Sequence, residues 1–318
     1  MSQKIIYLDQ HAWINLAQAY FGKNKDMYTL CEKVIKASES ECAIFPLSFN
    51  HLIETRNRRK TESRKRLIEF MVKVSKEYTI LPMYCITEAE IRNTILRRLG
   101  FSTINIKEFV IGKGISHMFG GNPKIVGNIP ENVKNIMIKW LDNPDTYKEL
   151  LKRVVSVDDR HSYIDKIKEL EDERIWIFNT VRDKQRRYEF ALARNIISVL
   201  TLKIAEICNE LHDSVSIFKD WTENDFVKVI NLKKNYVNII EEIPTFYIPF
   251  ILSYYSECDF NRKIIINDIN DIYHLAMAIP YCDIVLPDRM FAGIAKQRLG
   301  QIYPAIILSS IKELEEHI

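Results

Sequence analysis

The segment from Asp268 to Asp288 constrains the fold of this chain more than any other stretch. Its first part predicts a helix, because apolar residues recur at helical spacing over 272–279. Asp268 and Asp271 lie one turn apart at the start of that helix, so their carboxylates point the same way. The next part, 283–286, is a short apolar run of strand character, and Asp288 follows it beyond a proline. A helix that leads into a buried strand, with acids at both ends, predicts an α/β fold with a polar rim, where such folds place their sites.

Two further acids accompany predicted strands. Lys4–Asp9 predicts a buried first strand, and Asp9 stands where that strand passes into a helix. A helix cap or a polar strand end would explain this acid equally well. Glu41–Ser48 predicts a second strand and a following helix that is capped by Ser48 and carries Glu54. Taken alone, Glu54 is an ordinary helix residue, but its place soon after a strand end could return it to the rim of Asp9.

Composition sets outer bounds on function. The 318 residues are 47% hydrophobic, so the chain can bury a large core in two domains or in one domain with a large insertion. The 45 basic and 42 acidic residues give a net charge of only +3, so a nucleic-acid surface must come from local clustering. The six cysteines include no C-x-x-C pair, which disfavours a zinc module or a disulfide framework and favours a reduced, cytoplasmic setting. We expect no signal peptide and no membrane span, because the longest apolar run, Phe246–Tyr255, is far shorter than the roughly 20 residues that a span needs.

A basic segment follows Glu54 directly. Between Arg56 and Arg66 the chain has seven basic residues and one acid. Such a run commonly forms a solvated helix face. Here it adjoins a candidate catalytic acid, where a nuclease needs cations that neutralise phosphates, and we give phosphate binding equal weight. The candidate nucleic-acid-binding residues are Arg56, Arg58, Arg59, Arg64 and Lys65.

Two more strands complete the α/β pattern. Tyr78–Pro82 predicts a third strand, and Tyr303–Leu308 predicts the last one. Thr87 and Glu90 form a capping-box pattern, which predicts a helix over Ala89–Leu99. Strands therefore occupy both ends of the chain.

The middle of the chain departs from this rhythm. The stretch Ile111–Gly127 holds five of the nine glycines and predicts a loop, and helical periodicity dominates 130–240. The sequence thus predicts one α/β domain with a large helical insertion. The expected division is 1–100 and 256–318 for the two parts of the α/β domain and 101–255 for the insertion.

Four acids from separate elements lie at or near predicted strand ends, namely Asp9, Glu54, Asp271 and Asp288. In a parallel sheet these ends meet at one edge, so we expect the four carboxylates to converge. Clustered carboxylates raise one another's pKa unless a cation lies among them, and oxygen ligands favour Mg²⁺ or Mn²⁺. Such an ion polarises a phosphodiester and supplies hydroxide near neutral pH, so these residues are candidate metal-binding and catalytic groups for phosphodiester hydrolysis.

The same motifs resemble the PIN-domain nucleases, which include bacterial toxins. The resemblance rests on Tyr7-Leu8-Asp9, Glu54, Asp271-Ile272-Tyr273-His274-Leu275-Ala276 and Leu286-Pro287-Asp288, and it covers roughly residues 1 to 100 and 260 to 318. It implies a three-layer α/β/α fold around a parallel sheet and an endoribonuclease dependent on Mg²⁺ or Mn²⁺, with Asp9, Glu54, Asp271 and Asp288 as the family's four acids. RNA is then the expected partner, and an antitoxin or other protein regulator and a second copy of the chain are further candidates.

The chain departs from the family pattern at three places. His11 stands where the family often has a small hydroxyl or amide residue, Pro287 stands where Thr or Ser commonly precedes the last acid, and the insertion is longer than a compact toxin domain allows. Four residues are candidates for a supporting role around the acids, namely His11, Asp268, His274 and Asp283. Asp268 also suits a helix N-cap, and His274 is more readily explained as a packed helix residue than as a ligand.

Two other functions stay open. A catalytically degenerate PIN-like domain could bind RNA or a partner protein without cutting, and His11 and Pro287 are the residues that favour this reading. A structure-specific DNase acting on DNA is the second and is less favoured, because the stretch Gly112–Gly127 resembles a DNA-gripping hairpin only faintly. A comparison of metal-dependent cleavage of RNA and of DNA distinguishes the endoribonuclease, the binding module and the DNase.

Overall fold

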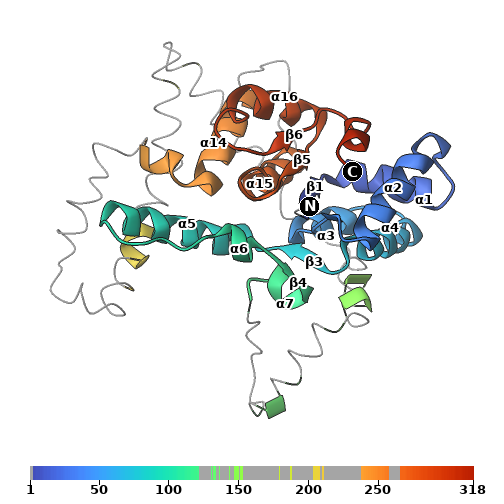
Figure 1. Cartoon of the computed structure of the whole chain (residues 1–318), viewed down its shortest axis with the longest axis horizontal. Coiled ribbons are helices and arrows are strands. Elements are labelled where there is room, and N and C mark those ends of the chain that lie inside the picture. The colour runs from blue at the N-terminus through green and yellow to red at the C-terminus, as the bar shows by residue number, and fades with distance from the viewer. Residues whose placement is uncertain are drawn as a thin grey trace. The chain divides into compact units, whose positions relative to one another are not determined.

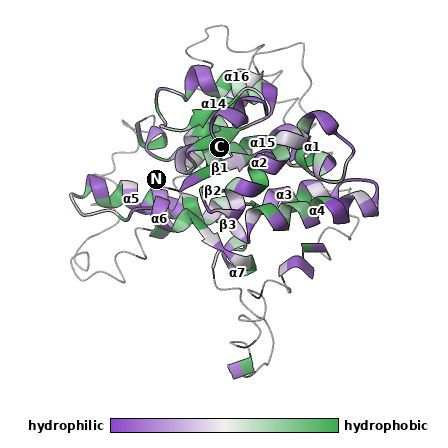
Figure 2. Ribbon diagram, turned by 45° about the vertical axis from the view of Figure 1, so that its right-hand side comes forward, coloured by the Kyte–Doolittle hydropathy of each residue, from purple (hydrophilic) through white to green (hydrophobic). Residues whose placement is uncertain are grey.

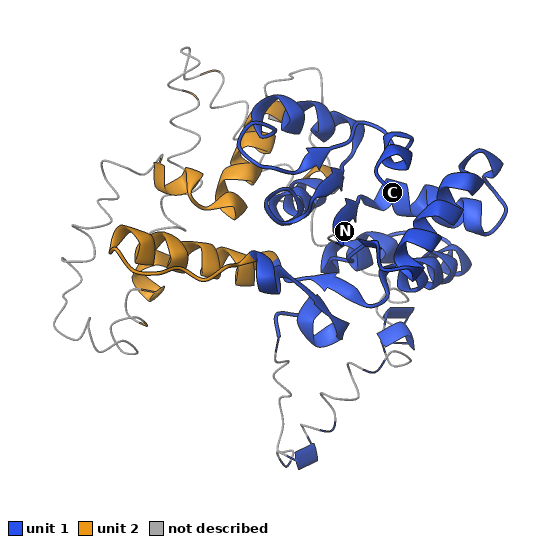
Figure 3. Ribbon diagram, viewed as in Figure 1, with its two compact units in different colours: residues 1–82, 107–163, 269–318 blue, residues 83–106, 164–268 orange. Residues whose placement is uncertain are grey.

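The computed structural model in Figure 1 describes residues 3–121, 238–257 and 266–318, together with isolated residues between 130 and 210. The chain is an α/β protein that divides into two compact units, drawn in blue and orange in Figure 3. The first unit comprises residues 1–82, 107–163 and 269–318, and the second comprises 83–106 and 164–268. The two ends of the chain thus belong to the same unit.

A four-stranded parallel sheet lies at the centre of the first unit. Its strand order is β2 (Ala43–Ile44), β1 (Lys4–Leu8), β5 (Ile284–Leu286) and β6 (Ile306–Ile307). The strands predicted from the apolar runs at both chain ends are confirmed, with shorter bounds than the runs themselves. Leu8 pairs with Leu286, so the residues that follow these two emerge side by side at the carboxyl edge of the sheet.

Helices contact β1 from both faces, because its side chains alternate. Ile6 and Leu8 join a core with residues of α1 (Gln10–Tyr20), α2 (Tyr28–Glu39) and α4 (Thr61–Ser75). The intervening Tyr7 contacts rings on α3 (Phe49–Arg56) and α15 (Ile266–Tyr281). Helices such as α1 and α4 carry both hydrophobic and hydrophilic residues, as Figure 2 shows, and bury the former. The first unit also contains η1 (Lys25–Met27), α6 (Lys107–Val110), α16 (Arg289–Arg298) and η3 (Glu313–Glu316).

The third predicted strand, β3 (Tyr78–Ile80), forms but has an antiparallel partner. That partner is β4 (Ile111–Lys113), followed by α7 (Gly114–Met118), so the prediction of a loop beginning at residue 111 is wrong. Position 112 requires glycine, because the ring of His117 approaches its backbone so closely that a Cβ would collide with the ring. A parallel bridge between Leu47 and Thr79 joins this pair of strands to the chain that leaves β2.

In the second unit, α5 (Met83–Arg98) packs against α14 (Pro244–Glu257). The predicted capping box is wrong, because α5 begins at Met83 and Thr87 lies inside it, donating to the Met83 carbonyl at 2.8 Å. Glu90 is buried and instead accepts hydrogen bonds from the backbone N–H and the hydroxyl of Thr245, at 2.9 and 2.5 Å. Glu90 therefore satisfies the first turn of α14, where a carboxylate is favoured by the helix dipole.

The unit boundaries differ from the expected division of the chain. The helix α5, expected in the α/β domain, belongs to the second unit, and the segment from Lys107 belongs to the first because β4 pairs with β3. Most of the helical stretch predicted over 130–240 lies outside the described residues. None of the helices in the described ranges has the length and hydropathy needed to cross a membrane.

Candidate active site at the carboxyl edge of the sheet

Asp9 and Asp288 follow the two central strands, β1 and β5. The Asp9 N–H donates to the Leu286 carbonyl at 3.0 Å, which ties the two strand ends together. Each aspartate is also the N-cap of the next helix. Asp9 Oδ1 accepts from the Ala12 N–H and Asp288 Oδ1 from the Met290 N–H, both at 2.9 Å. Asp9 is therefore a helix N-cap, which is one of the two explanations that its position in the sequence allowed. Its carboxylate still lies at the carboxyl edge of the sheet.

Glu54 lies on α3 among other carboxylates. The pKa of Glu54 is raised to about 9, mainly by burial, with further contributions from the nearby charges of Asp271 and Asp9. The pKa of Asp9 is raised to about 6, mainly by burial, with a contribution from Asp288, while its backbone hydrogen bonds and His11 oppose the shift. The structure thus brings Asp9, Glu54 and Asp271 into one electrostatic neighbourhood and places Asp288 beside Asp9.

A buried polar network supports Glu54. His274 Nε2, on α15, lies 3.2 Å from Glu54 Oε1, with only 4% and 12% of the two side chains exposed. The two atoms are close but not aligned as a hydrogen bond, and neither has another partner in the described part of the chain. On its other side, His274 Nδ1 contacts the hydroxyls of Tyr7 and Ser48. His274 therefore joins the sheet, through Tyr7, to the candidate catalytic acid.

His51 continues this network on α3. Its Nδ1 accepts from the Ser48 N–H at 2.9 Å, so the neutral ring carries its proton on Nε2 and donates to the Leu8 carbonyl at 2.9 Å. Burial lowers the pKa of His51 to about 4 and that of His274 to about 3, so both rings are neutral near pH 7. The sequence predicted Ser48 as the cap of this helix, which is confirmed, but it did not predict the part that Tyr7, Ser48 and His51 take in this network. A tyrosine inside a buried strand is the signal that could have found them, because its hydroxyl needs a partner.

The other three candidates for a supporting role, His11, Asp268 and Asp283, lie at different positions relative to the acids. His11 is exposed beside Asp9 and contacts the Asn15 amide at 3.2 Å. Asp268 is buried within the first turn of α15, not at its N-cap, and belongs to the second unit. Asp283 precedes β5, about 16 Å from Asp288 at about 3.3 Å per strand residue. It accepts from the Ile5 N–H and the Lys107 ammonium at 2.8 and 2.9 Å, so the role expected for it near the acids is wrong and its role is structural.

The basic segment forms the connection from α3 to α4 and the first turn of α4. Arg64 is buried and donates to the Arg56 carbonyl and the Thr61 hydroxyl, both at 2.9 Å. Its expected role in nucleic-acid binding is therefore wrong, because the guanidinium is used to close this connection. Arg59 and Lys65 are exposed, and Arg56 and Arg58 are partly exposed.

The carboxylates suit a hard cation in their chemistry. In the described ranges and isolated positions, no three His, Cys, Asp or Glu side chains are arranged as a ready metal-binding group. Glu54 Oε1 is nevertheless a buried oxygen without a hydrogen bond, in the field of two neighbouring acids. A cation beside it would satisfy that oxygen and offset the repulsion, provided that the side chains turn toward it. The donor set therefore fits Mg²⁺ or Mn²⁺.

The chain matches no family model, no curated protein and no solved structure.

Proposed function

We propose that this protein is a PIN-like endoribonuclease that hydrolyses RNA phosphodiester bonds with Mg²⁺ or Mn²⁺. The observation that carries the proposal is the gathering of acids at the carboxyl edge of a parallel sheet, where Asp9 and Asp288 follow the paired strands β1 and β5 and the charges of Asp271 and Asp9 act on Glu54. Burying and crowding carboxylates without a partner cation costs stability, and active sites are where such costs are found. The parallel sheet with helices on both faces of β1 supports a three-layer α/β/α arrangement.

Asp9, Glu54, Asp271 and Asp288 are the residues that would hold the ion. When bound, the ion polarises the scissile phosphodiester and lowers the pKa of a water molecule, which supplies the nucleophile. The protein's own groups prepare the site. The backbone N–H of Ala12 fixes one oxygen of Asp9, and His274, held by Tyr7 and Ser48, limits where the Glu54 carboxylate can lie.

One specific observation favours a second function, a PIN-like module that binds RNA without cutting it. Asp9 and Asp288 both serve as helix caps, and no three acids among the described residues form a ready ligand group. On this reading the acids that remain from an ancestral site would have structural duties only.

Cleavage assays on matched single-stranded RNA and DNA oligonucleotides decide between these functions. With Mg²⁺ or Mn²⁺, we expect cleavage of RNA, none in EDTA, and a loss of more than about 100-fold in Asp9→Asn and Asp271→Asn, in line with several kcal/mol of lost charge stabilisation. Asn also caps helices well, so Asp9→Asn removes the charge and keeps the fold. Binding of RNA without cleavage would support the second function, and cleavage of DNA alone would contradict both.

A further inference from the structure

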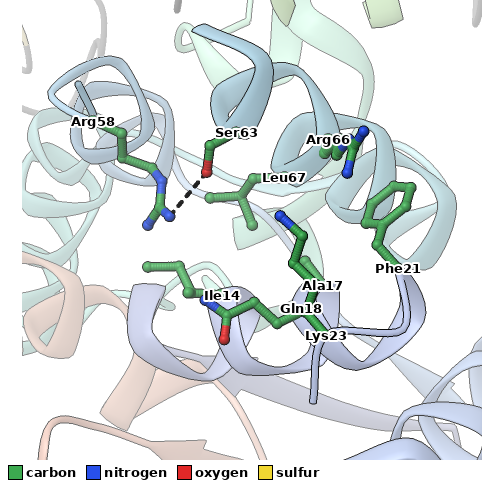
Figure 4. A pocket seen from close by; sticks show the side chains of 9 residues that line it. All are labelled: Ile14, Ala17, Gln18, Phe21, Lys23, Arg58, Ser63, Arg66 and Leu67. Atoms are coloured by element: carbon green, nitrogen blue, oxygen red, sulfur yellow. Dashed lines mark hydrogen bonds between the residues drawn. The ribbon is translucent and has the colours of Figure 1, made fainter. Parts of the chain in front are cut away.

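A small basic pocket lies between α1 and α4, away from the carboxylates. Figure 4 shows its lining, in which Lys23 and Arg58 reach into the space between the two helices and Arg66 stands at its edge. Gln18 and Ser63 add polar groups, and apolar residues of both helices form the walls. Its volume of about 70 Å³ is far below the roughly 300 Å³ of a pocket that encloses a drug-sized molecule, so it suits a group the size of a phosphate.

The charge in this pocket is only partly compensated. Arg66 Nε lies 3.3 Å from Glu62, one helical turn away, and its guanidinium stands over the Phe21 ring. Arg58 has no carboxylate partner among the described residues, and its one described hydrogen bond runs from Nη2 to the Ser63 hydroxyl at 3.1 Å. Lys23 is exposed and has no ion pair in the described part of the chain. Two cations therefore face the pocket without a counter-ion among the residues that the structure describes.

Arg58 is partly buried in this position. Burial lowers the pKa of its guanidinium, because it is partly withdrawn from water while carrying its charge. Most of its five N–H donors stay available in a planar fork, the geometry that matches two oxygens of one phosphate. An anion in the pocket would offset the cost of this burial.

We propose that this pocket binds a backbone phosphate of the RNA substrate, with Lys23 and Arg58 as its main ligands. This inference rests on the proposed function, because that function names RNA as the substrate. The pocket and the acids share two elements. Asp9 caps α1, and the lining residues of α1 begin at Ile14, about 7 Å along the axis at about 1.5 Å per residue. Arg58 follows α3 four residues after Glu54. An RNA strand held at the acids would therefore carry a neighbouring phosphate close to the pocket.

The test is RNA affinity as a function of salt. A labelled single-stranded RNA is titrated with the full chain in EDTA, so that binding is read without cleavage. Each lost phosphate contact lowers the slope of log affinity against log salt by about 0.7, and the pocket makes one such contact, so Lys23→Gln/Arg58→Gln should lower the slope by about 0.7. Lys23→Gln alone, at an exposed position that cannot affect folding much, should lower the slope by less than the double variant does. The matched control is Lys25→Gln/Lys36→Gln, which removes the same charge from exposed positions outside the pocket and should keep the wild-type slope.

Equal slopes for wild type and both pocket variants would overturn the proposal, as would an equal fall in the control, which would indicate a diffuse basic surface. Inorganic phosphate tests the other source of this ligand. If it raises the Tm of wild type but not of the double variant while the RNA slopes agree, the pocket binds free phosphate and the assignment to RNA is overturned. A lowered slope in a chain that does not cleave RNA supports the phosphate site and contradicts the nuclease. Cleavage of RNA by a chain whose variants keep the wild-type slope supports the nuclease and contradicts the phosphate site.

Discussion

His274 Nε2 lies 3.2 Å from Glu54 Oε1, although the two residues come from helices at opposite ends of the chain. Both side chains are buried, and His274 is held from its other nitrogen by hydroxyls of the sheet and of α3. The ring therefore lies directly beside the carboxylate on which the charges of Asp271 and Asp9 also act. We expect His274 to act as a positioning residue for Glu54.

We expect His274→Ala to lower RNA cleavage by about 10- to 100-fold, the usual cost of removing a group that orients a metal ligand. The fall should lie in kcat and in the affinity for Mn²⁺, while KM for RNA stays near the wild-type value. A purely structural role would instead lower the fraction of folded protein and leave kcat per folded molecule unchanged. His274→Gln, which can still donate toward Glu54, should recover part of the activity.

The free energy of unfolding of the metal-free protein should fall as the pH rises from about 6.5 to 8.5. The range ends at about pH 8.5 because thiols in model peptides begin to ionise there. Glu54 has a folded-state pKa of about 9 against 4.5 unfolded, so it binds a proton in the folded state that the unfolded state has released. The free energy of unfolding then falls by up to about 1.4 kcal/mol per pH unit. The pKa values of His51 and His274 are lowered by folding, so these residues affect the free energy of unfolding only at lower pH. There the unfolded state binds protons that the folded state does not, and acidification reduces stability.

Urea unfolding at several pH values in EDTA measures this effect. Glu54→Gln should remove the fall between pH 6.5 and 8.5 and stabilise the metal-free protein at the upper end. Glu62→Gln, a change of equal charge at a side chain that is 71% exposed, should leave the pH profile as in wild type. A flat wild-type profile would show that burial and the neighbouring acids do not raise the pKa of Glu54 in the folded state.

Mn²⁺ should raise the Tm, and more so at pH 8 than at pH 6.5. A cation binds ionised carboxylates, so binding has to displace the proton from Glu54, and this costs less at higher pH. At 100 times Kd the stabilisation amounts to about 2.7 kcal/mol. Asp271→Asn should abolish the shift, and NaCl of equal ionic strength should not reproduce it. The same Tm with and without Mn²⁺ in wild type would contradict a metal site here.

Arg64→Ala should destabilise the protein by about 1–3 kcal/mol, because it removes a buried guanidinium that donates to Arg56 and Thr61. Arg59→Ala, at an exposed position of the same segment, should stay within about 0.5 kcal/mol of wild type. Denaturant unfolding of the two variants compares them directly. Similar stabilities would mean that Arg64 is as solvated as its neighbours.

The sequence predicted the parallel strands and their acids because both signals are local. A continuous apolar run identifies a parallel strand, and an acid at its end needs no partner to be recognised. The capping box at Thr87 failed because a helix that starts earlier, at Met83, makes the same residues interior. The glycines near Gly112 suggested a loop, whereas the structure uses one of them to admit a histidine ring beside a strand.

The network behind Glu54 could not be predicted in the same way. Ser48 and His51 contact each other within the first turn of α3, but they meet Tyr7 and His274 only through strand pairing and helix packing between distant segments. The role of Arg64 depends likewise on the carbonyl of Arg56 across a turn, and a run of basic residues does not distinguish it from Arg59.

The pairing of β1 with β5 also determines when the site can form. Tyr7 and His274 are separated by 267 residues, and the first and last parts of the chain share one sheet. Closing so long a loop is slow, and the N-terminal strand has no partner on this side until the last part of the chain has been synthesised. Until then the hydrophobic residues of β1 and α1 lack the part of their core that Ile284 and Leu286 supply. A chain that stopped before residue 271 would lack Asp271 and Asp288, so the candidate acids come together only after the last part of the sheet has been made.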